Sequence, residues 1–202
     1  MSFYSTYVLP RITDFVMRNQ ENAKQRAKLV PRAEGDVLEV AIGSGLNLAH
    51  YGNSVRRLFG VDPSPRLLQM ARARTRGLPF PVELVERSAE MLPFDDATMD
   101  TVVVTWGLCS VPNPIDALRE MKRVLKPSGR LLFVEHGKSS DPAVGRWQDR
   151  MNPIWKAVAG GCNLNRPIDE LVRAAGFQIA ELRTEYLPGP RIMTFTYHGA
   201  AA

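Results

Sequence analysis

Apolar residues along the chain fall into short runs separated by stretches with helical spacing. The runs have the length and composition of buried strands and lie at 37–42, 58–61, 82–85, 100–105 and 131–135. The intervening stretches predict helices at 46–51, 64–72 and 114–125. Because strands and helices alternate, the pattern predicts an α/β fold with a Rossmann-like, doubly wound sheet that is mostly parallel.

The C-terminal part has a different pattern. Segments 177–184 and 191–198 are strand-like, and the turn-forming residues Tyr186-Leu-Pro-Gly-Pro190 join them. We expect an antiparallel strand pair at one edge of the sheet, which argues against a dehydrogenase. The length of 202 residues predicts a single domain, composed of an N-terminal helical cap (1–34), a ligand-binding core (35–135) and a third part (136–202) with an insertion and the strand pair.

A glycine-rich turn, Gly43-Ser44-Gly45, directly follows the first strand. Glycines at a strand-to-helix turn let a ligand approach the backbone, and the next helix offers unpaired N–H groups. A dinucleotide fingerprint has a third glycine where Leu48 stands, and a Walker lysine is absent. Two acids instead accompany the turn, Glu39 within the strand and Asp62 at the end of the next strand. A carboxylate at that second position can accept both ribose hydroxyls, so we expect a nucleoside ligand without a pyrophosphate.

An ordered set of motifs resembles the class I S-adenosylmethionine-dependent methyltransferases. The motifs are Leu38-Glu-Val-Ala-Ile-Gly-Ser-Gly45, Val61-Asp-Pro-Ser64, Ser88-Ala-Glu-Met-Leu-Pro-Phe94 and Arg123-Val-Leu-Lys-Pro-Ser-Gly-Arg130. The resemblance covers about residues 35–135 and implies S-adenosyl-L-methionine as cofactor. One departure is Ala41, where the family usually has glycine.

The resemblance also implies which residues bind the cofactor. Ser88 and Ala89 would border the adenine, and the segment after the fourth strand would lie where the methyl group leaves. There the Trp106 ring is suited to a cation–π contact with the sulfonium, or to the core. The expected cofactor residues are Glu39, Ala41, Gly43, Ser44, Gly45, Asn47, Asp62, Pro63, Ser88, Ala89, Glu90, Thr105 and Trp106.

A narrower resemblance concerns the acceptor side. Leu108-Cys-Ser-Val111, Glu135-His136, Trp147-Gln148, Asn152-Pro-Ile-Trp155 and Gly161-Cys-Asn-Leu164 look like the methyltransferase-like thiol methyltransferases. The animal members of that family carry an N-terminal membrane anchor, which we do not expect here. The acceptor is then a small molecule, a thiol, and His136 is the best-placed general base. The expected acceptor pocket consists of Tyr51, Cys109, His136, Trp147 and Trp155.

Nucleic acid is not expected as a substrate. The net charge of +5 comes from basic residues spread over several elements. The segment after the fourth strand also lacks the Asn/Asp-Pro-Pro-aromatic motif of base-amino methylases and the Pro-Cys nucleophile of cytosine-carbon methylases. Two alternatives stay open. One is a lipid or quinone-precursor methyltransferase, and the other is a basic nucleic-acid-binding protein with a vestigial cofactor site.

The remaining composition sets the expected environment. The two cysteines, Cys109 and Cys162, show no paired spacing, so neither a disulfide framework nor a metal site is expected. We expect a cytoplasmic protein of open oligomeric state. The helical pattern at 3–29 fits a lid over the cofactor, a helix at the sheet edge, or a surface helix in peripheral contact with a membrane.

Overall fold

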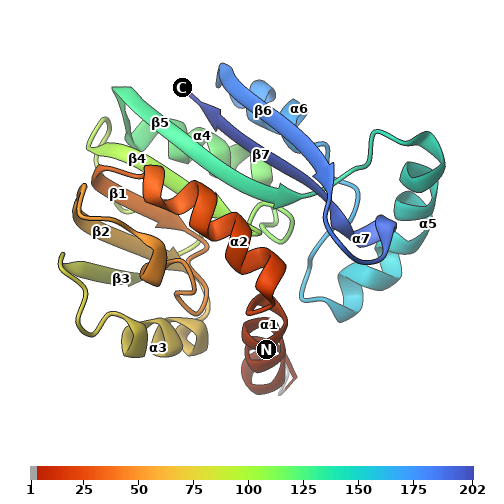
Figure 1. Cartoon of the computed structure of the whole chain (residues 1–202), viewed down its shortest axis with the longest axis horizontal. Coiled ribbons are helices and arrows are strands. Elements are labelled where there is room, and N and C mark those ends of the chain that lie inside the picture. The colour runs from red at the N-terminus through yellow and green to blue at the C-terminus, as the bar shows by residue number, and fades with distance from the viewer. Residues whose placement is uncertain (1–3) are drawn as a thin grey trace.

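The computed structural model describes residues 4–202, which form one seven-stranded sheet in the order β3-β2-β1-β4-β5-β7-β6 (Figure 1). Strands β3 to β5 in that order are parallel, β7 is antiparallel to β5, and β6 is antiparallel to β7. The bounds are β1 (Gly35–Val40), β2 (Val55–Asp62), β3 (Val82–Glu86), β4 (Met99–Thr105), β5 (Leu125–His136), β6 (Ile179–Tyr186) and β7 (Phe195–Ala201). The predicted fold class, with its antiparallel edge, is confirmed.

Helices cover both faces of this sheet. In Figure 1, α2 crosses in front of the central strands, whereas α4 lies behind them and α6 lies behind the edge strands β6 and β7. Several helices begin as the sequence predicts: the Ser64 side chain accepts from the N–H of Leu67, with Pro65 at the first helical position. The bounds are α1 (Leu9–Met17), α2 (Gln20–Leu29), α3 (Pro65–Arg74), α4 (Pro114–Val124), α5 (Pro142–Val158), α6 (Ile168–Ala174) and α7 (Arg191–Thr194). In addition, η1 (Tyr4–Val8) is a short π-helix, and η2 (Val30–Arg32) and η3 (Leu48–His50) are short 3-10 helices.

The central strands are buried on both sides because successive side chains point to opposite faces. On β5, Leu131 and Phe133 belong to the core under α4 and α6, whereas Leu132 and Val134 belong to the core under α2 and α3. None of the helices within residues 4–202 has both the length and the apolar character needed to cross a membrane.

Three predicted elements differ from the structure. The expected helix at 46–51 is only the short 3-10 helix η3, because Gly52 and Asn53 start the approach to β2. The expected strand at 191–198 begins with α7 and becomes strand only at Phe195, since the backbone N–H of Met193 bonds to the carbonyl of Pro190. The expected helix at 3–29 is broken at Asn19, whose side chain caps α2, and Phe3 lies outside the described residues.

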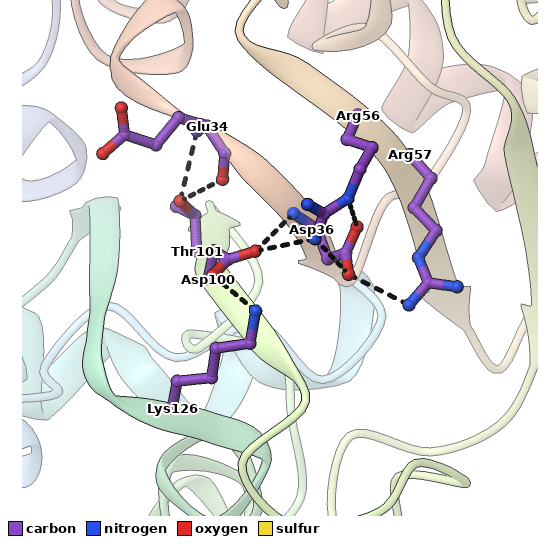
Figure 2. A network of polar contacts seen from close by, with 7 residues as sticks. All are labelled: Glu34, Asp36, Arg56, Arg57, Asp100, Thr101 and Lys126. Carbon is purple, nitrogen blue, oxygen red and sulfur yellow. Dashed lines mark hydrogen bonds and ion pairs between the residues drawn. The ribbon is translucent and has the colours of Figure 1, made fainter.

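A polar network fixes the amino ends of the central strands (Figure 2). Asp36 on β1 pairs with Arg56 and Arg57 on β2, and Asp100 on β4 accepts from Lys126 and from the N–H of Asp36. The hydrogen bond from Arg56 holds the pKa of Asp36 at about 2. A cavity of about 450 Å³ lies at this edge. Parallel sheets bind ligands at the opposite, carboxyl edge, so we assign this network to strand registration.

Candidate active site

The glycine turn after β1 combines left-handed backbone with close packing. Gly43 and Gly45 have φ of 58° and 79°. A Cβ on Gly45 would lie 2.8 Å from Leu48 Cδ1 and 3.1 Å from the Cα of Ala71, whereas a Cβ on Gly43 would meet only a carbonyl oxygen at 3.8 Å. Gly45 therefore brings the turn onto α3, and Gly43 leaves its backbone open to a ligand.

Ala41 occupies the position where the family usually has glycine, and it keeps a left-handed φ of 55°. Its methyl group fits because residue 107 is glycine: a Cβ on Gly107 would lie 2.6 Å from the Cβ of Ala41. Trp106 beside it also has a positive φ, of 50°. Strained residues from two loops thus meet at this edge, as they often do at functional sites.

Asp62 lies at the carboxyl end of β2, beside the glycine turn. Its Oδ2 accepts from the N–H of Gly43 at 3.0 Å, and its Oδ1 accepts from the N–H of Ser64 at 2.8 Å. Burial raises the pKa of Asp62 to about 6, against the lowering effect of these two bonds. Because a carboxylate has about four acceptor positions, it retains capacity for two ligand hydroxyls.

Glu39 is the second buried acid at this edge. Its Oε1 accepts from Asn47 at 2.9 Å and its Oε2 from the Tyr51 hydroxyl at 2.8 Å, and Asn47 also donates to Thr105 Oγ1. Burial raises the pKa of Glu39 to about 8. Tyr51, expected in the acceptor pocket, is instead buried with its hydroxyl on Glu39 and its ring edge against Phe80. It therefore positions the acid from within the core.

Arg26 on α2 is a site residue that sequence reasoning missed. Its Nε donates to Asn47 Oδ1 at 3.0 Å, its Nη1 donates to the carbonyl of Met17, and its guanidinium lies 4.8 Å from the centre of the Trp106 ring. The cation that the Trp106 ring faces in this structure is therefore Arg26, whereas the sequence analysis suggested the sulfonium of the cofactor. Burial lowers the pKa of Arg26 to about 10, although nearby Glu39 opposes this. Within a charged helix, nothing in the sequence marks this arginine as buried.

A cavity of about 80 Å³ lies beside the glycine turn, and Asp62 is not among the residues that line it. Helices α1 and α2 form part of its wall through Thr13, Asp14, Met17 and Arg26, which fits the predicted helical cap. Ligand pockets are usually several hundred Å³, so we expect α1 and α2 to move outward when a nucleoside cofactor binds. From the expected cofactor set, the cavity is lined by Glu39, Ala41, Gly43, Ser44, Asn47, Thr105 and Trp106.

An ion pair fastens α1 to the site. Asp14 is buried, and its carboxylate pairs with Arg74 of α3 at 2.8 Å and with Arg18. Arg74 also donates to the carbonyl of Ser44 in the glycine turn. Although burial opposes it, hydrogen bonds and the arginine charges lower the pKa of Asp14. The cap is therefore tied directly to the turn it covers.

The remaining expected cofactor residues lie around the ends of β2 and β3. Pro63 is exposed, and Ala89 is buried in the core. The Ser88 hydroxyl donates to the carboxylate of Glu90, which also accepts from the N–H of Asn113 at 3.0 Å. Glu90 therefore joins this turn to the start of α4, and the adenine contacts of Ser88 and Ala89 stay predictions.

On the acceptor side the structure separates the expected residues. Trp147 on α5 is 57% exposed, with Arg150 over its ring, so it does not wall a pocket. Trp155 is half-buried, and its Nε1 lies 3.4 Å from Cys162 Sγ. His136 Nε2 lies 3.1 Å from the same sulfur. Contrary to the expectation from cysteine spacing, the ligand atoms of Cys109, His136 and Cys162 all lie within 4.8 Å of one another.

Glu135 organises the turn that carries Trp106 and Cys109. It is fully buried, and its Oε1 accepts from the N–H groups of Gly107 at 2.7 Å and Leu108 at 2.9 Å, while Oε2 has no partner. Burial raises the pKa of Glu135 to about 7. Glu135 therefore positions the loop that lies between the expected cofactor site and the expected acceptor site.

Comparison with known proteins agrees with this geometry. A family model described as a methyltransferase domain matches residues 38–133. Human thiol S-methyltransferase TMT1B is 32% identical over 197 residues, a match that covers 93% of this chain and 80% of that protein. The ubiquinone/menaquinone biosynthesis C-methyltransferase UbiE of Azotobacter vinelandii is 35% identical over 129 residues, which covers 61% of this chain and 51% of that protein.

A solved structure gives the same fold. The S-adenosylmethionine-dependent methyltransferase of Thermotoga maritima, described as a possible histamine N-methyltransferase, superposes with a TM-score of 0.68. The superposition covers 98% of both chains at 22% sequence identity. At that identity the likeness supports the arrangement of strands and helices and carries no information on the acceptor.

Proposed function

Because the chain belongs to the class I S-adenosylmethionine-dependent methyltransferases, in the family of the thiol S-methyltransferases, we propose that it methylates a small, fairly apolar thiol. One observation carries this choice of acceptor. The match to TMT1B covers 93% of the chain and so includes the acceptor side, whereas the match to UbiE covers 61%. Fold and cofactor are common to both relatives, so the segment beyond the cofactor core decides between them.

The residues of the carboxyl edge fit S-adenosyl-L-methionine. Asp62 has free acceptor positions for ribose hydroxyls, and the open backbone at Gly43 admits the ligand. Glu39 and Asn47 offer a carboxylate and an amide to the methionine end, beside the positive charge of Arg26. This donor and acceptor set would hold a zwitterionic amino-acid group.

When bound, S-adenosyl-L-methionine would supply an electrophilic methyl group. The acceptor sulfur would form the new C–S bond, the electron pair of the broken C–S bond would stay on the departing sulfur, and the thiol proton would pass to solvent. The protein must therefore exclude water, position the acceptor and favour its thiolate. Positioning alone can supply about 7 kcal/mol or more of the barrier reduction. The role of His136 as general base stays a prediction.

The test is transfer of a labelled methyl group from S-adenosylmethionine to a panel of acceptors. The panel contains hydrogen sulfide, short alkyl thiols, phospholipids and quinone precursors, with transfer RNA as a control. We expect label on the alkyl thiols and none on RNA. Label that appears on quinone precursors or lipids and not on thiols would replace the thiol proposal with the second candidate, which the UbiE similarity favours. The Asp62→Asn variant is a second comparison, since we expect it to bind the cofactor more weakly and to transfer less label at limiting cofactor.

A further inference from the structure

Three side chains with metal-binding atoms converge beside the active-site turn. Cys109 lies in the turn after β4, His136 is the last residue of β5, and Cys162 lies in the loop between α5 and α6. Their two Sγ atoms and a ring nitrogen lie within 4.8 Å of one another, and the contact from His136 Nε2 to Cys162 Sγ is 3.1 Å. Three elements far apart in sequence thus present one compact donor set.

The loop that carries Cys162 is fastened to the turn that carries Cys109. The backbone N–H and the side-chain amide of Asn163 donate to the carbonyl of Cys109 at 2.8 and 2.9 Å. Arg166 donates to the carbonyl of Val111 at 2.7 Å, and Asn152 of α5 accepts from the N–H of Leu164 at 2.7 Å. Backbone and amide contacts, and not the sulfur atoms, hold the two segments together, so the donor set is preformed.

We propose that Cys109, His136 and Cys162 bind a zinc ion. Two thiolates and one imidazole form a donor set typical of zinc, and three protein ligands with an open fourth position characterise catalytic zinc sites. With Zn–S near 2.3 Å and Zn–N near 2.0 Å, tetrahedral geometry places these ligand atoms about 3.5–3.8 Å apart. The observed separations include 3.1 Å, between His136 Nε2 and Cys162 Sγ, and none exceeds 4.8 Å, so these limits lie on both sides of that value. Side-chain rotations alone would therefore bring the three atoms into tetrahedral positions around the ion.

The surroundings of the cluster suit bound thiolates. The indole N–H of Trp155 lies 3.4 Å from Cys162 Sγ, and the Ser110 hydroxyl lies 3.4 Å from Cys109 Sγ. Donors to coordinated sulfur orient the ligand and tune its basicity. The Arg166 guanidinium interacts electrostatically with both cysteines and adds positive charge near two anionic ligands. Trp155, which sequence analysis assigned to the acceptor pocket, thus supports a ligand.

The fourth position gives the site a role in methyl transfer, a step that rests on the proposed function. A thiol that coordinates zinc loses its proton to solvent, so an acceptor bound there is already a thiolate. The cluster lies next to the cofactor cavity, because the sulfur of Cys109 contacts the carbonyl of Trp106, which lines that cavity. In this arrangement His136 acts as a ligand, and a separate protein base is unnecessary.

Metal binding is tested on the reduced full-length chain without any acceptor. Titration with Co²⁺ should give one equivalent of tetrahedral site, with ligand-field bands in the visible and sulfur-to-metal bands in the near ultraviolet, and Zn²⁺ should displace the cobalt. The chain contains only two cysteines, so the sulfur bands report on this pair. Reduced, folded protein that shows no sulfur-to-cobalt band at one equivalent overturns the proposal.

Variants identify the ligands. Cys109→Ser and Cys162→Ser should each lose most of the sulfur-to-cobalt intensity, and His136→Gln should weaken cobalt binding at least tenfold. His50→Gln is the matched control, because His50 lies outside the cluster, and it should bind cobalt like the wild type. Binding of S-adenosylhomocysteine, measured by calorimetry, shows that each variant is folded. Unchanged cobalt spectra in a folded Cys162→Ser variant would contradict the assignment.

A second experiment tests whether the acceptor thiol coordinates the metal. Addition of an alkyl thiol to the cobalt protein should increase the sulfur-to-metal absorption, since a third sulfur enters the open position. If the cobalt spectrum does not change when the thiol is added, the acceptor does not coordinate the metal, although the metal site itself is still supported. Conversely, thiol methylation by the metal-free protein at the full rate would leave the proposed function intact and remove the metal from it.

Discussion

At the scale of single residues, the site contains neighbouring residues whose sizes depend on each other. Ala41 can stand in a tight left-handed turn because Gly107 leaves room for its methyl group. The alanine that replaces the family's glycine after β1 is thus accommodated by a glycine after the neighbouring strand, β4. Asp62 likewise depends on a partner. Burial disfavours its ionised carboxylate, and hydrogen bonds from ligand hydroxyls would stabilise that negative charge.

The pairing of Ala41 with Gly107 predicts a coupled pair of mutations. Gly107→Ala brings two Cβ atoms to 2.6 Å and should cost about 1–3 kcal/mol of unfolding free energy by overpacking. Adding Ala41→Gly should recover part of that loss, whereas Ala41→Gly alone should be nearly neutral, because relieved strain offsets the entropy of glycine. Chemical denaturation of all four proteins gives the coupling energy. Gly52→Ala is the control, since its Cβ meets nothing within 4 Å; strict additivity would contradict the packing argument.

Asp62 predicts how cofactor affinity depends on pH. Ligand hydroxyls donate to the carboxylate, so binding needs the ionised acid, whose pKa in the ligand-free protein is about 6. Affinity should be level above that value and fall by up to about tenfold per pH unit below it. Calorimetry with S-adenosylhomocysteine between about pH 5 and 8 measures this.

The Asp62→Asn variant is the control for that pH profile. It should bind more weakly by about 1.5–3 kcal/mol at neutral pH and lose the inflection near pH 6. Any slope that remains in this variant comes from a group other than Asp62. Wild-type affinity that stays constant through pH 6 would show that Asp62 does not contact the cofactor.

At the scale of elements, the sequence predicted the strands better than their connections. The runs at 82–85 and 100–105 agree with β3 and β4 within a residue, since valine-rich segments buried on both faces have few alternatives. The stretch at 46–51 has helical spacing but is too close to β2 to form more than one turn. Local spacing cannot show how soon the chain must enter the next strand.

The same distinction applies to the site. The positions of Glu39, Asp62 and the glycines at the carboxyl ends of β1 and β2 were predictable, because those positions follow from strand ends and turns. Arg26 was not, since its burial depends on how α2 docks across the sheet, and Trp147 was misplaced because helical aromatics can face either side. The meeting of Cys109 with Cys162 depends on a loop that closes only in the folded protein.

The ion pair between Asp14 and Arg74 predicts a change in cofactor kinetics. Asp14→Asn should weaken the docking of α1 by about 1–2 kcal/mol, which increases the open population about 5- to 30-fold. Association and dissociation of S-adenosylhomocysteine should both accelerate, measured by stopped-flow tryptophan fluorescence. Glu21→Gln, which removes an exposed pair with Lys24, is the control. Unchanged rates would mean that α1 does not limit entry.

At the scale of the whole molecule, both the cap and α5 carry exposed apolar side chains. Ile12, Phe15 and Val16 of α1 are exposed, as are Ile154 and Val158 of α5. The Tyr4 hydroxyl of η1, directly before α1, donates to the carbonyl of Val158 at the end of α5. Arg11 and Arg18 accompany the apolar residues on α1, so this surface fits the peripheral membrane contact that the sequence suggested.

This surface predicts binding to anionic phospholipid vesicles. Phe15 is 80% exposed, and Phe15→Glu should weaken co-sedimentation with such vesicles about tenfold or more, because an aromatic ring leaves the lipid and a like charge replaces it. Leu182→Glu makes the same change in charge on β6 and should bind like the wild type. Equal binding by both variants would exclude α1 as the contact.

The two edges of the sheet respond to acid at different pH values. Asp36 at the amino edge has a pKa of about 2, below its ordinary value of 3.8, so its contribution to stability is complete above pH 4 and is lost only as pH falls toward 2. Asp62 at the carboxyl edge becomes neutral near pH 6. Mild acid should therefore release the bound product while the strands stay in register, which offers a way to strip and reload the enzyme without denaturing it.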